Sequence, residues 1–174
     1  MPQNVNQYDY INVSKHSKVY LIVLEKYLAP VYIDETGFDT YFYREYGRSL
    51  KGQIRRSYQR ISLVAGLTNG ELIAPMTYEE TMTSDFFEAW FQKFLLPTLS
   101  TPSVIIMDNA RFHRMGKLEL LCEEFGNKLL PLPPYSPEYN PIKKTWAHIK
   151  KHLKKVLPRC NTFFEALLSC SCFN

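Results

Sequence analysis

The 174-residue sequence lacks a long apolar segment, a signal peptide and a cysteine framework. Its longest apolar run, Val19–Leu24, falls far short of the roughly 18 residues that a membrane span needs. The first 17 residues are polar, without the charged-then-apolar pattern of a signal peptide. Cysteine occurs only at positions 122, 160, 170 and 172, too sparsely for a disulfide scaffold. We therefore expect a soluble cytoplasmic protein with reduced thiols and no membrane partner.

Acidic residues are also absent from a long stretch, between Tyr139 and Phe164. The net charge is +4, from 21 Lys and Arg and 17 Asp and Glu. Residues 139–174 hold seven basic residues and one acid, a balance of +6, which leaves 14 − 16 = −2 for residues 1–138. Such a segment indicates either a polyanionic partner such as nucleic acid or a solvated, lysine-rich helix face. Charge alone does not separate the two.

The hydrophobic and turn patterns predict a single α/β domain. The predicted strands lie at 31–33, 41–47, 58–66, 71–76, 104–107 and 128–132, and the predicted helices at 19–28, 83–96, 117–125, 141–157 and 163–168. Asn69-Gly70 is a strong hairpin signal, Gly37 indicates a turn, and Pro75 indicates a strand end or an edge strand. Because a hairpin joins the early strands and helices join the later ones, we expect a mixed sheet with helices on its faces.

Two of the predicted strands end at an aspartate. Asp34 follows Val31–Ile33, and Asp108 follows Val104–Met107. In open α/β sheets the carboxyl edge is where ligands bind, and two neighbouring carboxylates there would favour a hard cation such as Mg²⁺ or Mn²⁺. The alternative is that each aspartate merely caps a turn.

Three segments together carry a resemblance to a known family: YIDETGF (32–38), MDNARFH (107–113) and PPYSPEYNPIKKTW (133–146). Residues 20–160 resemble the catalytic domain of DDE transposases, specifically bacterial insertion-sequence enzymes related to the mariner superfamily. The resemblance implies a ribonuclease-H-like fold, a mixed five-stranded sheet with helices on both faces. It also implies cut-and-paste DNA transposition with two divalent cations, Mg²⁺ or Mn²⁺, held by three acids.

The resemblance assigns the first acid to Asp34 and the second to Asp108, both as catalytic residues and metal ligands. The family's third acid follows the second after 34 intervening residues, and 143 − 108 = 35 places Lys143 there. We therefore expect impaired catalysis, because an ammonium group replaces a metal-binding carboxylate. Glu138 and Glu35 are the alternative third acids.

The resemblance also implies DNA partners, both transposon ends and target DNA, a homodimer, and a nucleoid-associated place in a bacterial cytoplasm. The residues expected to contact DNA are His113, Lys144, Lys150, Lys151, Lys154 and Lys155, with the basic stretch 44–60 as a second candidate. His113 has an alternative, structural hydrogen-bonding role. Relatives carry amino-terminal helix-turn-helix modules. We expect such recognition to come from a separate polypeptide or a frameshifted fusion, or to be lost.

Several smaller predictions concern the C-terminal third. Asn140 should cap the helix that starts at Pro141, and Trp146 should lie in the core. His148 and His152 have the i, i+4 spacing of a zinc pair, but no third ligand is evident and a solvated face is the favoured interpretation. The motif Cys170-x-Cys172 lacks a partner pair at zinc spacing, so no structural zinc site is expected.

The sequence thus predicts a lead-in at 1–17, an endonuclease domain at 18–160 and a helical tail at 161–174. The main functional hypothesis is a DDE transposase catalytic domain with impaired activity. Two alternatives are a noncatalytic DNA-binding or dimerisation remnant and a ribonuclease-H-like nuclease. Mg²⁺-dependent strand breakage would separate the first two, and cleavage of RNA in hybrids would identify the third.

Overall fold

A computed structural model describes residues 29–39, 60–133 and 139–173 of the chain. The strands are β1 (Ala29–Asp39), β2 (Arg60–Thr68), β3 (Glu71–Tyr78), β4 (Ser103–Met107) and β5 (Lys128–Pro131). The helices are α2 (Ser84–Trp90), α3 (Met115–Glu124), α4 (Ile142–Val156) and α5 (Phe163–Leu168). The predicted helix at 19–28, the strand at 41–47 and Glu138 lie outside the described residues, as does nearly all of the basic stretch 44–60.

Within the described residues the strands form one five-stranded sheet in the order β3-β2-β1-β4-β5. β1 pairs antiparallel with β2, and β2 antiparallel with β3, whereas β1–β4 and β4–β5 are parallel. Asn69 and Gly70 both have positive φ, as a tight two-residue hairpin turn requires. Pro75 lies inside β3, which is an edge strand and therefore tolerates the missing N–H. The predicted mixed sheet is confirmed.

β1 runs further than predicted. It continues past Asp34 to Asp39, so the expected strand end at Asp34 and the expected turn at Gly37 are both wrong. The cause is β2, which pairs with β1 as far as Asp39 although the pairing with β4 stops at Tyr32. Gly37 instead provides space, since a Cβ there would lie 2.9 Å from the guanidinium of Arg60.

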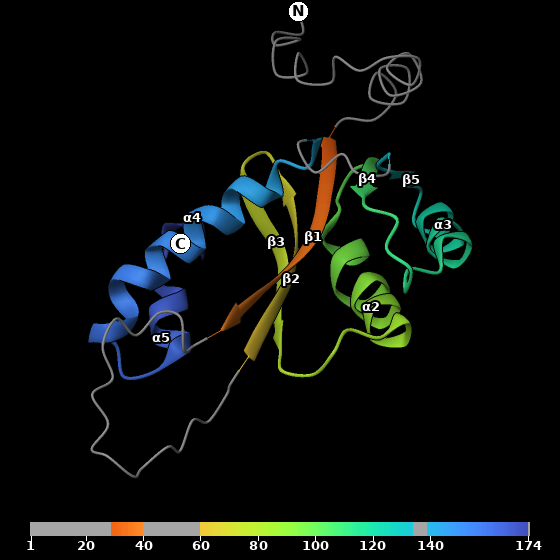
Figure 1. The fold of residues 1–174 in the computed structure, drawn as a ribbon. Helices are drawn as coiled ribbons and strands as arrows, with labels where there is room; N and C mark the ends of the chain where they lie inside the picture. The colour runs from red at the N-terminus through yellow and green to blue at the C-terminus, as the bar shows by residue number, and fades with distance from the viewer. Residues whose placement is uncertain (1–28, 40–59, 134–138, 174) are drawn as a thin grey trace, which may run out of the picture.

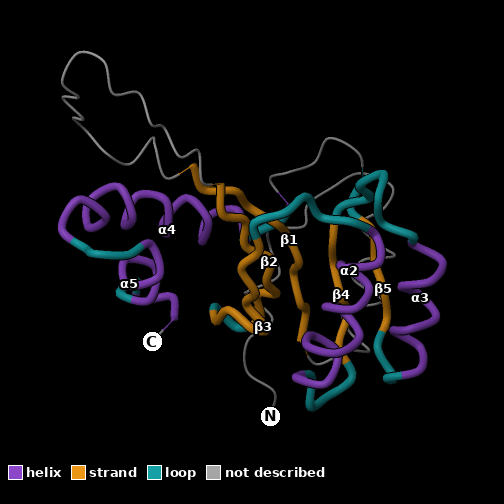
Figure 2. Tube along the Cα trace, turned by 90° about the horizontal axis from the view of Figure 1, so that it is seen from below, coloured by secondary structure: helices purple, strands orange, loops and turns teal. Residues whose placement is uncertain are grey.

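Helices cover both faces of the sheet, as the resemblance implied. Figures 1 and 2 show α2 and α3 on one side and α4 and α5 on the other. The α2 side encloses buried residues that include Val31, Ile33, Phe87, Trp90 and Met107. The α4 side encloses Phe38, Leu63 and the apolar stripe of α4, which consists of Ile142, Trp146, Ile149 and Leu153. The prediction that this stripe faces the core is confirmed.

The segment after β3 is helical as predicted but irregular. Thr83 accepts a hydrogen bond from the Phe86 N–H at 3.2 Å and so caps α2. Beyond α2 the chain passes through a π-helical turn (Phe91–Leu95) and a 3₁₀ turn (Leu96–Thr98) rather than one continuous helix. No helix in the described ranges combines the length and apolar character that crossing a membrane requires.

Candidate active site

The two aspartates that follow the apolar runs come together on one face of the sheet. Tyr32 in β1 lies opposite Ile106 in β4, and Asp34 and Asp108 are each two residues further along. Because side chains alternate with a period of two along a strand, both carboxylates emerge on the same face and at the same level. Both also line a cavity of about 150 Å³. The prediction that Asp34 and Asp108 lie close together is confirmed.

Asp34 is held by two side chains from the first turns of α4. The Lys143 ammonium Nζ donates to its two carboxylate oxygens at 2.9 and 3.1 Å, and the Trp146 indole N–H donates to Oδ2 at 3.1 Å. Lys143 and Trp146 are three residues apart and share a helix face. The Asp34 side chain is only 9% exposed, and that of Lys143 is 40% exposed. A cation already neutralises the first carboxylate of the site.

The start of α4 is fixed to β1 by Asn140. The predicted N-cap role of Asn140 is wrong, because its side-chain amide instead donates to the Ile33 carbonyl at 2.9 Å, and α4 begins without a side-chain cap. The backbone carbonyl of Asn140 accepts from the Lys143 N–H at 3.1 Å. The Asn140 side chain therefore attaches the start of α4 to β1, and this attachment positions Lys143 beside Asp34. A local capping rule could not reveal a hydrogen bond to a residue 107 positions away.

Burial raises the pKa of the Asp34 carboxyl above its usual value. Removing a carboxylate from water disfavours its charged form. The Lys143 ammonium opposes this through its hydrogen bonds and charge, while the negative charge of Asp108 raises the pKa further. Because the net shift of the Asp34 pKa is upward, burial affects this pKa more than the Lys143 ammonium does.

Asp108 has a different environment. Its side chain is 57% exposed, and one oxygen lies 3.4 Å from Nε2 of His113, which is itself only 4% exposed. The hydrogen bond from His113 lowers the pKa of Asp108 below its usual value, against the opposing effect of burial. The His113 ring lies against Phe87 and Phe112, with ring centroids 4.3 and 4.2 Å away. This enclosure favours the hydrogen-bonding role over direct DNA contact for His113.

Glu35, one of the alternative third acids, lines the same cavity. The Tyr78 hydroxyl donates to its carboxylate at 2.9 Å. Burial raises the pKa of Glu35, and the carboxylates of Asp108 and Asp34 raise it further. Tyr78 is a site residue that no sequence pattern indicated, since 43 residues separate it from Glu35. Glu138, the other alternative acid, is outside the described residues.

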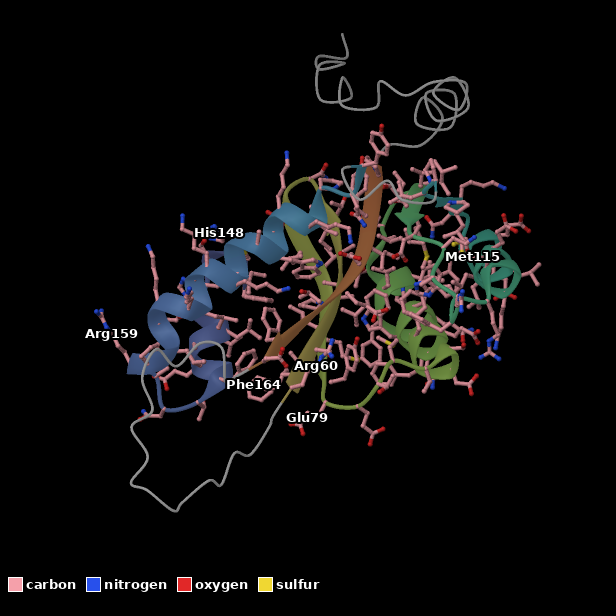
Figure 3. The ribbon with its side chains drawn as sticks, viewed as in Figure 1. Arg60, Glu79, Met115, His148, Arg159 and Phe164 are labelled. Carbon is pink, nitrogen blue, oxygen red and sulfur yellow. The ribbon has the colours of Figure 1, made fainter. Side chains whose placement is uncertain are left out.

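Four of the six lysines of α4 are exposed, whereas Lys143 contacts Asp34 in the sheet. Lys144, Lys151, Lys154 and Lys155 are exposed, and the Lys150 ammonium lies 5.9 Å from the centre of the Phe38 ring. Figure 3 shows nitrogen-tipped side chains projecting from this helix into solvent. No acid lies on α4, so the helix presents a positively charged surface next to the aspartates.

The carboxylate oxygens of the described site residues do not fit a pair of divalent cations. Both Asp34 oxygens accept from Lys143, and position 143 supplies an ammonium instead of a carboxylate. Two unit charges 4 Å apart interact by about 4 kcal/mol at an effective dielectric of about 20, and a divalent ion doubles this. Among the described residues, Asp108 keeps the more accessible carboxylate, and Mg²⁺ usually binds through one or two carboxylates.

A five-stranded mixed sheet in the order β3-β2-β1-β4-β5, with helices on both faces, is the ribonuclease-H-like fold. The model of the protein family described as DDE superfamily endonuclease matches residues 30–163. This match covers most of the chain, which therefore belongs to that family of endonucleases. A comparison with curated proteins finds no match.

Solved structures show the same fold at low sequence identity. The paired-end complex of Mos1 transposase with the left transposon end is 16% identical, with a TM-score of 0.58, over 95% of this chain and 54% of that chain. The integrase catalytic core domain of HTLV-2, in complex with magnesium, is 16% identical with a TM-score of 0.52, over 79% of each chain. The chain thus spans about half the length of the Mos1 chain that it matches.

Proposed function

We propose that this chain is a DDE transposase catalytic domain that binds DNA but cleaves and joins strands poorly. The observation that carries the proposal is the Lys143 ammonium at 2.9 Å from Asp34, at the position of the family's third acid. The match to an endonuclease family supports this function over a noncatalytic remnant or a nuclease for RNA in hybrids. Asp34 and Asp108 are the proposed catalytic carboxylates, and His113 is proposed to position Asp108.

DNA is the proposed partner because of the exposed lysines of α4 and the nature of the similar structures. The Mos1 structure contains a transposon end, and the HTLV-2 integrase domain is described in a dimeric form. The α4 lysines would bind phosphates and so give affinity that depends on salt and not on sequence. A homodimer acting on transposon ends and target DNA is the proposed assembly, with sequence recognition from a helix-turn-helix polypeptide in a bacterial cell.

The proposed domain boundaries are those expected from the sequence, 1–17, 18–160 and 161–174. They can be checked by limited proteolysis, which should cut first near residue 17. The segment 161–174 packs through Ala166 and Leu167 against α4, so we expect the first cuts to spare it.

The loss of the third carboxylate accounts for the proposed impairment. In this class of enzyme, divalent cations activate the attacking water or 3′-hydroxyl and stabilise the leaving oxygen. Mg²⁺ or Mn²⁺ is the proposed ion, with Asp34 and Asp108 as its ligands once the ammonium of Lys143 is removed. Replacing Lys143 by glutamate both removes the competing cation and supplies the missing ligand.

The test is metal-dependent nicking of a transposon-end DNA duplex. Lys143→Glu should raise the Mg²⁺-dependent nicking rate by roughly 100-fold or more, since removal of a single group that stabilises a transition state commonly costs about that factor. Lys143→Gln removes the ammonium without adding a carboxylate and should give at most a small gain. Lys144→Glu makes the same charge change one residue along and should not raise nicking.

Equal and strong nicking by the unchanged chain and by Lys143→Glu would contradict impairment by Lys143. An increase in Lys144→Glu equal to that in Lys143→Glu would show that helix charge, and not the ligand position, limits the reaction. If Asp34→Asn in the Lys143→Glu background keeps the regained activity, Asp34 is not a catalytic carboxylate.

A further inference from the structure

Three sulfur and nitrogen ligands that are separated in the sequence meet on the α4 side of the sheet. One ring nitrogen of His148, from the middle of α4, and the Sγ atoms of Cys170 and Cys172 all lie within 4.8 Å of one another. Cys170 is fully buried, Cys172 is half-buried and His148 is exposed. Figure 3 places His148 on α4, and Figures 1 and 2 show the C-terminal end on the same side of the sheet.

We propose that His148, Cys170 and Cys172 form a zinc site that joins the C-terminal segment to α4. Thiolate and imidazole are the ligands that Zn²⁺ prefers, and tetrahedral zinc binds with ligand distances of about 2.0–2.3 Å. Ligand atoms already within 4.8 Å of one another need to move together only slightly to reach that geometry. Three protein ligands leave a fourth position for water, on the side where His148 is exposed.

The local structure holds these ligands in place before any ion binds. The His152 ring and the Ser169 hydroxyl are 2.8 Å apart, one helical turn after His148 and one residue before Cys170. The Cys170 N–H donates to the Leu167 carbonyl, and the Phe173 N–H donates to the Cys170 carbonyl. The chain around Cys170 and Cys172 is thus fixed both within itself and against α4.

The charge at the site suits a divalent cation despite the nearby lysines. Two thiolates and one neutral imidazole carry two negative charges, so the complex with Zn²⁺ is neutral. Binding would release the two thiol protons to solvent and leave both sulfurs at the same oxidation level. Because thiolates and not thiols bind zinc, metal binding and the loss of the two protons would occur together.

Neither the histidine pair nor the cysteine pair by itself predicts a zinc site. The histidine pair lacked a third ligand and the cysteine pair lacked a partner. The fold brings one member of the histidine pair, His148, to both cysteines, because α5 and the 3₁₀ turn Ser171–Phe173 pack beside α4. Cys160, which also packs against this core, is not part of the cluster.

The test uses the full 174-residue chain, reduced and freed of metal by a chelator, with Co²⁺ as the probe. We expect one equivalent of Co²⁺ to give a thiolate-to-cobalt charge-transfer absorption that Zn²⁺ abolishes and excess Mg²⁺ does not, since Mg²⁺ prefers oxygen ligands. Cys172→Ser should halve the intensity of this absorption. Cys172→Ser and His148→Gln should each weaken Zn²⁺ binding by about 100-fold or more, given that even outer-shell changes cost about 10–100-fold.

The matched control is Cys160→Ser, which removes a half-buried thiol of the same core and should leave the absorption and the zinc affinity unchanged. His148→Gln changes an exposed side chain, so a loss of binding in it is not explained by unfolding; circular dichroism verifies this. The proposal is overturned if no charge-transfer absorption forms, or if Cys172→Ser retains its full intensity. It is also overturned if mass spectrometry of the reduced chain, after re-exposure to air with Zn²⁺ present, shows a Cys170–Cys172 disulfide.

Discussion

At the scale of single residues, the ion pair between Lys143 and Asp34 dominates the site. A buried carboxylate normally needs a cation or several hydrogen-bond donors. In this chain an ammonium from α4 and an indole N–H from Trp146 satisfy Asp34. A charged side chain of the chain itself thus neutralises Asp34, where the proposed function would require a divalent cation.

The first residue-scale prediction concerns Lys143→Gln. Lys143 lowers the pKa of Asp34 against the effect of burial, so its removal should raise that pKa further. A carboxyl whose pKa is raised in the folded state binds its proton more tightly there, so stability falls as pH rises through the folded pKa. Carbon-detected NMR titration of the Asp34 carboxyl measures this directly. A pKa that stays the same or falls would show that the ion pair does not persist in solution.

The second residue-scale prediction concerns His113→Phe, which keeps an aromatic ring between Phe87 and Phe112. His113 is the main cause of the lowered pKa of Asp108, so the Asp108 pKa should rise towards its usual value. A lowered carboxyl pKa contributes stability above the unfolded value of 3.8 that is lost as pH falls through the folded pKa. The variant should therefore be less stable than the unchanged chain at neutral pH, and this difference in stability should shrink as the pH falls through the folded pKa of Asp108. Asp34, whose pKa shift has other causes, is the control in the same NMR titration.

At the scale of elements, α4 carries both the site and its attachment to the sheet. One face of the helix buries four apolar side chains, and the opposite face exposes lysines. The same helix holds Lys143 at its first turn and His148 near its middle. Any change that loosens α4 should therefore affect the ion pair with Asp34 and the proposed zinc site together.

The element-scale prediction is that Ile149→Ala lowers the free energy of unfolding by about 2–4 kcal/mol. Ile149 is completely buried, and removing its outer carbons takes away apolar packing and leaves a cavity. Lys151→Ala, an exposed change on the same helix, should stay within about 0.5 kcal/mol. Urea denaturation of both variants measures the difference. Similar destabilisation of the two would mean that α4 is held to the sheet by something other than its apolar stripe.

At the scale of the whole molecule, charge is separated between the two ends of the chain. The C-terminal 36 residues carry +6 (7 − 1) and the rest −2 (14 − 16). In the structure the positive part is largely the exposed side of α4, next to Asp34. The two aspartates of the candidate site and the basic helix therefore adjoin, and in the proposed function this arrangement would bring a phosphate backbone to the carboxylates.

The molecule-scale prediction is a change in salt dependence of DNA binding. Replacing Lys151, Lys154 and Lys155 by glutamine should weaken binding and reduce the slope of log K against log salt by about 0.9 for each phosphate that the helix no longer neutralises. Lys93→Gln, an exposed lysine in the helical segment after α2, is the matched control and should not change the slope. An unaltered slope in the triple variant would exclude α4 as the DNA-binding surface.

Much of the fold followed from sequence pattern. The strands, the Asn69-Gly70 hairpin and the apolar stripe of α4 depend on local periodicity and turn chemistry, which neighbouring residues determine. The convergence of Asp34 and Asp108 also followed, because each aspartate comes directly after an apolar run and these two runs pair as neighbouring parallel strands, although β1 does not end at Asp34. The end of β1 could not be predicted from local pattern, because pairing with β2 extends this strand to Asp39. The Asn140 side chain likewise binds a carbonyl 107 residues away instead of capping its own helix.

The sequence by itself determined that Asp34 and Asp108 each follow an apolar run and that a lysine stands 35 residues after Asp108. Only the tertiary structure decided that the lysine contacts Asp34, that Tyr78 holds Glu35, and that His148 meets Cys170 and Cys172. The physical reason is the distance along the sequence over which each kind of interaction acts. Periodicity and turn preferences act over a few residues, whereas ion pairs, hydrogen bonds and ligand clusters depend on which surfaces the folded chain brings within a few ångströms.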